Sequence, residues 1–447
     1  MSPRRRRATV LAAATVLCAT AAPVASAAAT APHAAAKPSK LPDGLYGTAD
    51  PKYDGVWRQS MALLALDGAG AVPAKKAVDW LAGQQCADGS FTAYRADTGK
   101  KCDPDATPSD TNATALAVQA LAAVGGRSDA VREALEWLTS VQNKDGGWGS
   151  APRAASDANS TSLAIGALHA AGRNPEKATA QGGRSPYDAL LSFQLTCGAK
   201  GLENAPGQQG AFAYQPDKKG ELAPNDDATA AASLAALGEG ALPEPLSKDA
   251  KDKPVTPLKC ASDAGTDADA GTDEGDKKGV PGGRKQAAGA GAAYLAATLK
   301  KNGGHFSSVT PGDTKKQPDY ANTADAVVAL AAGGHRKPAR SSLAWLADNV
   351  NKWDKAKNDP AAISSLMLAS RAAGGDPTKL GGTDLLSRLG NTGPKPAKMP
   401  SDDADSSSSD KKDDGATIPV WAFILVGLAI GAGFGILLSG RRKRQQL

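Results

Sequence analysis

Four segments of this 447-residue chain place Asp or Asn side chains directly ahead of an apolar run. Carboxylates and amides in such positions can bind a polar ligand or take part in acid–base chemistry. The same side chains also cap helix N-termini, where each stabilises the helix by about 1 kcal/mol. Each segment has Asp or Asn four residues before a Thr: Asp110-Thr-Asn-Ala-Thr114, Asp157-Ala-Asn-Ser-Thr161, Asn225-Asp-Asp-Ala-Thr229 and Asp319-Tyr-Ala-Asn-Thr323.

The regular spacing of these segments indicates an internal repeat. Thr114 and Thr161 are 47 residues apart, and Thr229 and Thr323 are 94 apart, which is twice that interval. Poorer copies begin at Asp54 and Asp359. Each copy continues in Ala and aliphatic residues on nearly all sides, as a helix buried on every face requires. We therefore predict six inner helices.

A second, amphipathic helical segment follows each inner helix. The segments are 77–85, 130–142, 187–194, 292–301, 345–351 and 383–389. Each of the first four is followed by a turn that contains glycine and then an aromatic residue. The aromatic residues are Phe91, Trp148, Phe212 and Phe306. Glycine stops a helix by adopting positive φ, and a buried aromatic ring can fill the space between neighbouring helix pairs. We interpret this signature as structural.

This arrangement resembles the prenyltransferase and squalene-cyclase repeat family, over residues 45–390. The closest copy of the family's Gln and Gly-x-Trp motif is Trp137, Gln142 and Gly146-Gly147-Trp148. The resemblance implies an all-α fold, an α/α toroid in which six parallel inner helices surround a cavity and six outer helices run antiparallel to them.

Parallel inner helices would bring all their N-termini to one end of the cavity. We therefore expect a polar ring there, built from residues that are far apart in the sequence. The predicted ligand-binding residues are Asp110, Asn112, Asp157, Asn159, Asn225, Asp227, Asp319 and Asn322, together with His169 on an inner helix.

The family resemblance also raises two enzymatic activities. Terpene cyclases of this type use a DxDD acid, and the nearest match here, Pro224-Asn225-Asp226-Asp227, lacks the first Asp. They also need aromatic walls for carbocations, whereas this chain is 4% aromatic. If the protein is an enzyme, Asp226 and Asp227 are the candidate catalytic residues. The zinc site of protein prenyltransferases is not expected, because His169 has no evident Cys partner.

Cobalamin-binding proteins of the transcobalamin type have inner-helix starts similar to Asp110-Thr111-Asn112-Ala113-Thr114, but they also have a β-rich domain that this sequence lacks. We expect a non-catalytic cell-surface protein that binds a small molecule, with a corrinoid as one candidate, or a partner such as a membrane transporter component. The alternatives are an isoprenoid-converting enzyme of the cyclase or prenyltransferase type and a structural scaffold at the cell wall.

The two ends of the chain predict export and membrane anchoring. Residues 1–27 have the basic, apolar and small-residue regions of a signal peptide. Residues 391–417 are rich in Pro, Ser, Asp and Lys and predict a flexible stalk. The uncharged residues 418–438 match one membrane helix, and the basic tail 439–447 is expected in the cytoplasm. The toroid would then lie outside the cell.

Charge and cysteine content agree with an exported binding protein. The net charge of +6 includes four arginines at 4–7 and four basic residues at 441–444, and removing these eight leaves −2. Nucleic acid is therefore not an expected partner. The cysteines of the mature chain favour disulfides, with Cys86–Cys102 and Cys197–Cys260 as the short-range pairing and two other connectivities open. The acidic stretch of about 244–284 is expected to be a disordered insertion.

Overall fold

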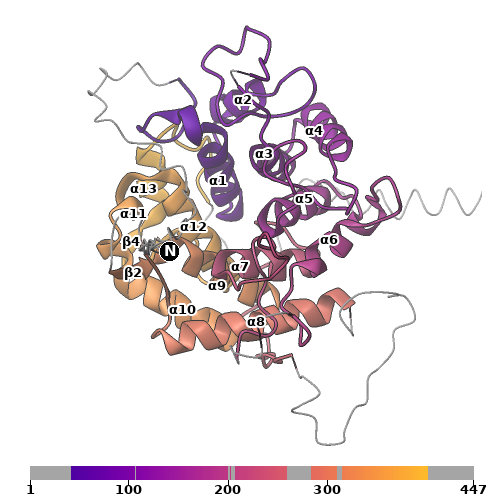
Figure 1. Cartoon of the computed structure of the whole chain (residues 1–447). Helices are drawn as coiled ribbons and strands as arrows, with labels where there is room; N and C mark the ends of the chain where they lie inside the picture. Colours follow the sequence, from indigo (N-terminus) through magenta and orange to yellow (C-terminus); the bar gives the residue numbers. More distant parts are fainter. Residues whose placement is uncertain are drawn as a thin grey trace, which may run out of the picture. The chain divides into compact units, whose positions relative to one another are not determined.

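The computed structural model describes residues 42–105, 107–199, 202, 207–258, 283–309 and 315–400. Within these residues, six helices form an inner ring (Figure 1). Each packs against the next, and the last packs against the first, which closes the ring. In ring order they are α1 (Gly55–Gly68), α3 (Thr111–Val124), α5 (Ala158–Ala170), α7 (Asp226–Ala236), α9 (Tyr320–Ala332) and α12 (Pro360–Ala372).

An outer helix packs against each inner helix. In Figure 1 these outer helices lie around the periphery of the ring. They are α2 (Lys75–Gly83), α4 (Ser128–Ser140), α6 (Pro186–Ser192), α8 (Gly283–Lys301), α10 (Arg336–Asn349) and α13 (Leu385–Asn391). The predicted α/α toroid with six inner and six outer helices is therefore confirmed. Helices α8 and α10 begin earlier than the sequence pattern indicated.

Short elements connect the main helices. Two antiparallel hairpins pair β1 (Phe306–Val309) with β2 (Lys316–Asp319) and β3 (Lys379–Leu380) with β4 (Thr383–Asp384). Single turns are η1 (Pro51–Tyr53), η2 (Pro175–Lys177), η5 (Val350–Lys352) and α11 (Lys355–Asn358). None of these elements contributes a further layer to the ring.

The recurring Thr joins each inner helix to the aromatic residue that precedes it. The backbone N–H of Trp148 donates to Thr161 Oγ1 at 3.1 Å, and the N–H of Phe91 donates to Thr114 Oγ1 at 2.9 Å. Phe212 and Phe306 make the same bond to the Thr of α7 and α9. All four aromatic side chains are buried. The Thr and the aromatic residue of the repeat are therefore two parts of one joint, which explains why they recur together.

The recurring Gln joins neighbouring outer helices. Gln142 Nε2 donates to the carbonyl oxygens of Gly146, at 2.7 Å, and Ala178, at 2.9 Å. Gln85 and Gln194 bond the Gly of their own motif and a backbone oxygen further along the ring in the same way. Gly146 has a φ of +92°, and a Cβ there would lie 2.1 Å from the Ser185 oxygen. The signature is structural, as predicted.

The predicted disordered insertion is partly ordered. After α7 the chain runs as an extended segment, residues 238–258, which we call the floor segment. In this segment, Leu246 N–H donates a hydrogen bond to Ala372 O at 2.9 Å. Lys253 N–H donates one to Gly334 O at 3.0 Å. The prediction of disorder from about residue 244 was therefore wrong for this part, because composition does not reveal backbone hydrogen bonds to distant helices. Residues 259–282 lie outside the described residues.

The beginning of the predicted stalk also belongs to the toroid. Pro394 O accepts a hydrogen bond from the buried Tyr46 hydroxyl at 2.7 Å, and Lys398 O accepts one from Val72 N–H at 2.9 Å. The stalk prediction was therefore wrong for residues 391–400. The predicted signal peptide, membrane helix and basic tail lie outside the described residues. Among those that are described, no helix has the length and apolar character needed to cross a membrane.

The disulfide prediction is confirmed for the first pair. Cys86 and Cys102 are bonded, with their Cα atoms 5.7 Å apart. Cys197 is also disulfide-bonded, but Cys260, its predicted partner, lies outside the described residues.

Candidate functional site

The inner helices enclose a cavity of about 450 Å³. Every inner helix contributes side chains to its wall. Most of the exposed wall is apolar, and the residues that contribute to it include Met61, Leu116, Leu163, Ala231, Val328 and Leu368. Ligand sites in proteins are typically cavities of about this size with apolar walls and a few polar groups. The cavity is therefore the candidate site.

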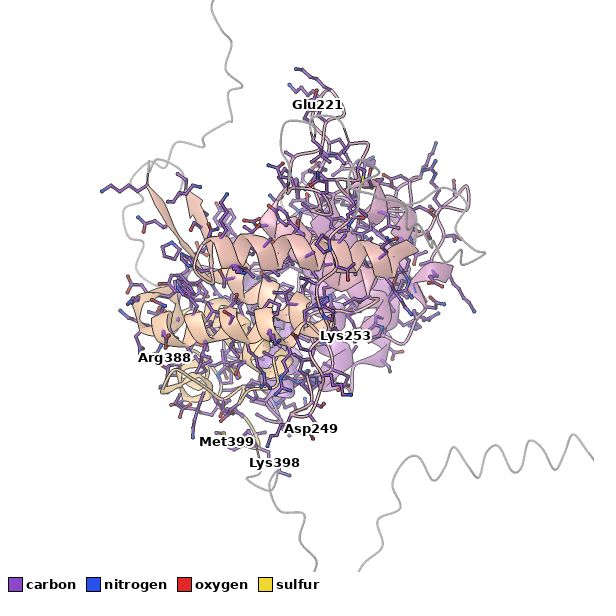
Figure 2. The ribbon with its side chains drawn as sticks, turned by 90° about the horizontal axis from the view of Figure 1, so that it is seen from below. Glu221, Asp249, Lys253, Arg388, Lys398 and Met399 are labelled. Carbon is purple, nitrogen blue, oxygen red and sulfur yellow. A yellow bond between two sulfur atoms is a disulfide. The ribbon has the colours of Figure 1, made fainter. Side chains whose placement is uncertain are left out.

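The floor segment covers the end of the cavity where the inner helices finish. Ala241 N–H donates to Gln119 Oε1 at 2.8 Å, and Gln119 Nε2 donates to Leu163 O at 3.2 Å. Gly240 lies against Gly166 of α5, so closely that a Cβ on Gly240 would be 3.2 Å from the Gly166 Cα. Figure 2 shows Asp249 and Lys253 of the floor segment on the side of the molecule opposite Glu221, which precedes the start of α7. The mouth of the cavity is therefore at the helix N-termini.

Half of the predicted polar ring consists of helix caps. Asp110 accepts from Ala113 N–H at 2.9 Å, and Asp157 accepts from Ser160 N–H at 2.7 Å. Asn225 and Asp319 cap α7 and α9 in the same way. These four side chains are engaged with the backbone of their own helix and do not line the cavity. Their part in the site is to fix the starts of the helices.

The other half of the predicted ring lines the cavity mouth. Asn112, Asn159, Asp227 and Asn322 all belong to its wall. Asn159 Nδ2 donates to Asp227 Oδ2 at 2.5 Å, which joins α5 to α7 across 68 positions of sequence. The side-chain oxygens of Asn112 and Asn159 are buried without a hydrogen-bond partner. The structure therefore brings these four residues together, as ring closure predicted.

Two other predicted residues lie elsewhere. Asp226 accepts a hydrogen bond from the Tyr294 hydroxyl of α8 at 2.9 Å and does not line the cavity. His169 is half exposed in the last turn of α5, 3.6 Å from Glu239 of the floor segment. Asp226 and Asp227 are neighbours in sequence and so point in directions about 100° apart on the helix. The structure therefore does not bring the two candidate catalytic residues, Asp226 and Asp227, into one site, and it places the predicted ligand-binding residue His169 at the floor end of α5.

Sequence analysis missed Asp325, a further acidic residue of the cavity wall. It lies two residues after Thr323 on α9, where the equivalent residues of α3 and α5 are Leu116 and Leu163. All three line the cavity. The signal was a single charged residue inside an otherwise apolar inner helix. Among the described residues, the Asp325 carboxyl group has no hydrogen-bond or ion-pair partner.

The protein surroundings raise the pKa values of both Asp325 and Asp227. Enclosure within the ring raises the pKa of Asp325 to about 8, and the neighbouring Asp227 and Asp319 add to the increase. The side chain itself is accessible from the cavity, so the enclosing protein atoms raise the pKa although the group can meet solvent in the cavity. Burial likewise raises the pKa of Asp227, against the effect of its hydrogen bond from Asn159.

Aromatic rings flank one side of the mouth. Trp57 and Trp353 line the cavity. The Trp353 ring stacks on Tyr320 with centroids 5.2 Å apart, and Tyr320 contacts Trp345 at 5.1 Å. His305 stacks on the other side of Trp345 at 4.2 Å. Aromatic faces attract cations and apolar groups, so this row extends the apolar surface outward from the mouth.

No cluster of His, Cys, Asp and Glu suited to a metal ion occurs in the part of the chain that the structure describes. The functional groups that line the cavity include carboxyl groups, amides and indole rings. These can accept hydrogen bonds, exchange protons and attract positive charge.

The comparison with protein families supports the toroid. Residues 48–202 match the family model of the prenyltransferase alpha-alpha toroid domain, which confirms the resemblance drawn from the repeats. A solved structure described as that of a protein from Actinoplanes is similar at 17% sequence identity and a TM-score of 0.40, covering 74% of this chain and 80% of that one. No curated protein matches the chain.

Proposed function

We propose that this prenyltransferase-type toroid is a non-catalytic binding protein for a small amphiphilic molecule. The apolar body of the ligand occupies the cavity, and its polar head lies among Asn112, Asn159 and Asp227 at the mouth. The observation that carries this proposal is the make-up of the cavity, which has a largely apolar wall, a covered floor and a group of polar side chains at its mouth, those of Asn112, Asn159, Asp227 and Asn322. A ligand that matches this division buries apolar surface without leaving polar groups unpaired.

The size of the cavity favours a compact ligand. Its volume of about 450 Å³ lies toward the lower end of the usual range for small-molecule sites. A whole corrinoid exceeds this volume and would have to bind across the mouth, against the row formed by Tyr320, Trp345 and Trp353. The proposal therefore favours a molecule with a single chain or small ring system over a corrinoid.

The place of binding is proposed to be the cell surface. The predicted signal peptide and membrane helix support this, and so does the disulfide between Cys86 and Cys102, because disulfides persist mainly in oxidising compartments. A membrane transporter component that receives the ligand is the proposed partner.

Binding can be tested with the neutral apolar dye N-phenyl-1-naphthylamine, whose fluorescence rises in apolar sites. Ala231 lines the cavity, and Ala231→Phe fills part of it. We expect saturable dye binding in the natural protein and an affinity at least about tenfold lower in this variant, because the added ring takes the space of the dye. The matched control is Ala344→Phe, at an exposed position of α10, which should leave binding unchanged. Absence of saturable binding, or equal affinity in both variants, would overturn the proposal.

An acid-catalysed reaction is the second candidate function, and the Asp325 carboxyl group favours it. With a pKa of about 8, this group holds a proton at neutral pH and lies in an apolar cavity, as a general acid requires. Conversion of a polyprenyl substrate, detected by mass spectrometry and lost in Asp325→Asn, would favour this candidate. The aliphatic wall beyond Trp57 and Trp353 supplies no further ring for a carbocation, which is why we prefer binding.

A further inference from the structure

The charges around the cavity are unbalanced. Four carboxyl groups line it, those of Asp227, Glu239, Asp325 and Asp359, and the one basic side chain among the lining residues is Lys355 on the exposed rim. Asp359 is engaged in capping α12, where it accepts from Ala361 N–H at 2.9 Å. Glu239 is at the floor, 3.6 Å from His169. Asp227 and Asp325 therefore form an acidic pair at the mouth that has no cationic partner among the described residues.

The inner helices around this pair present no compensating charge in the described part of the cavity wall. The neighbouring α5 presents Asn159 and its cap Asp157, and the start of α9 presents Asp319. The cavity faces of α1, α3 and α12 present Trp57, Asn112 and Ser365, none of which is charged. No inner helix places Lys or Arg among the residues that line the cavity. Apart from Lys355 on the rim, the charged and polar groups that the structure describes in the cavity wall around the pair are neutral or negative.

Arg58 differs from this acidic pair, because its charge is paired within the protein. This side chain is also on an inner helix and is 1% exposed. It donates to Asp54, Tyr46 O and Ala49 O, and so has its own set of partners outside the cavity. The carboxyl group of Asp325 has no such set among the described residues. Because the Asp325 side chain is exposed in the cavity, its carboxyl group is open to a cationic group of a ligand that enters.

We propose that the head of the ligand is a primary ammonium group, held between Asp227 and Asp325, and that it enters the mouth in exchange for a proton of this pair. This inference rests on the proposed binding function and adds the chemical class of the ligand. The ammonium N–H groups would donate to the carboxylate oxygens, and the Trp57 and Trp353 faces add attraction for the charge. The alkyl body would then lie against the aliphatic wall.

The exchange follows from the electrostatics of the pair. Without a ligand, enclosure and mutual repulsion keep Asp325 protonated around neutral pH. A bound ammonium ion replaces that repulsion with attraction and lowers both pKa values, so that about one proton is released to solvent for each ligand bound. Affinity should therefore rise about tenfold per pH unit between pH 6 and pH 8 and become constant at higher pH, as long as the amine stays protonated.

Three probes with one alkyl chain test this inference: decylammonium, 1-decanol and decanoate, titrated by calorimetry at pH 6, 7 and 8. We expect decylammonium to bind at least about tenfold more tightly than decanol at pH 7, and decanoate more weakly than either. Repeating the pH 7 titration in phosphate and in Tris should show release of about one proton, because the measured heat then differs by the protonation enthalpies of the two buffers.

The variant Asp325→Asn separates this inference from the proposed function. It should lose both the preference for decylammonium over decanol and the proton release. Asp348→Asn, at an exposed position of α10, should retain both. Equal binding of decanol and decylammonium without proton release would overturn the ammonium proposal and leave the binding function standing. If none of the probes and no N-phenyl-1-naphthylamine binds, the binding function itself fails.

Discussion

The two ends of the toroid are built in different ways. At the mouth, each of four joints repeats the same bonds between an aromatic residue, a Thr and a helix cap, as at Trp148, Thr161 and Asp157. At the other end, a single floor segment from outside the repeat crosses helix after helix, with a different contact at each. The repeat therefore forms the wall and mouth of the cavity, and a non-repeated segment covers its other end.

The largest expected effect is at a repeated joint. Trp148→Ala removes a 2% exposed ring that also donates its indole N–H to Leu138 O. We expect a loss of about 3 to 5 kcal/mol in the free energy of unfolding, measured with urea, because the cavity left behind cannot collapse fully. Tyr53→Ala, at a side chain that is 79% exposed, should change it by less than about 0.5 kcal/mol. A similar loss in both variants would contradict the assignment of Trp148 to the joint.

A second substitution tests the close approach between outer helices. Gly146→Ala places a Cβ 2.1 Å from the Ser185 oxygen at a φ of +92°, and should destabilise the protein by about 2 to 4 kcal/mol. Gly172 also has positive φ, +68°, but a Cβ there would meet nothing within 4 Å. Gly172→Ala should therefore lower stability by about 1 kcal/mol only, from backbone strain. The difference between the stability losses of the two variants measures the cost of the close contact at Gly146.

The floor segment should respond locally. Gly240→Ala would bring a Cβ to 2.6 Å from Gln119 Oε1 and loosen the segment where Ala241 N–H is bonded. We expect hydrogen exchange of the Ala241 and Leu246 amides to become at least about tenfold faster, with global stability lowered by about 1 kcal/mol. Glu244→Ala, at an exposed position of the same segment, is the control. If exchange at the mouth joints accelerates equally, the two ends are one cooperative unit and the contrast between them fails.

The smallest effect concerns the pH dependence of stability. The pKa of Asp325 is about 8 in the folded protein and about 4 when unfolded, so the folded state binds this proton more tightly between these values. Stability contributed by the proton is therefore full below pH 4 and is lost as the pH rises towards 8. Asp325→Asn should remove about 1 kcal/mol of that loss, since solvent in the cavity screens the charge. Denaturant unfolding at pH 5 and pH 8 measures it, and an unchanged slope would place Asp325 in open solvent.

The sequence by itself determined the repeating unit. Caps such as Asp110 and Asp157, the Thr after them and the Gly-aromatic ends act through bonds of short range, so their spacing was enough to predict both sets of helices. Their gathering at one mouth followed from the family resemblance, which implied a closed ring of parallel inner helices.

Only the tertiary structure decided which side chains face the cavity. Asp226 and Asp227 are equally acidic and adjacent, but helix rotation sends one to Tyr294 and the other to the mouth. Asp325 became a candidate when its helix was placed beside α7, because its pKa depends on neighbours from other repeats. The floor segment has no sequence signature, since backbone hydrogen bonds hold most of it in place, and any residue except proline can donate them.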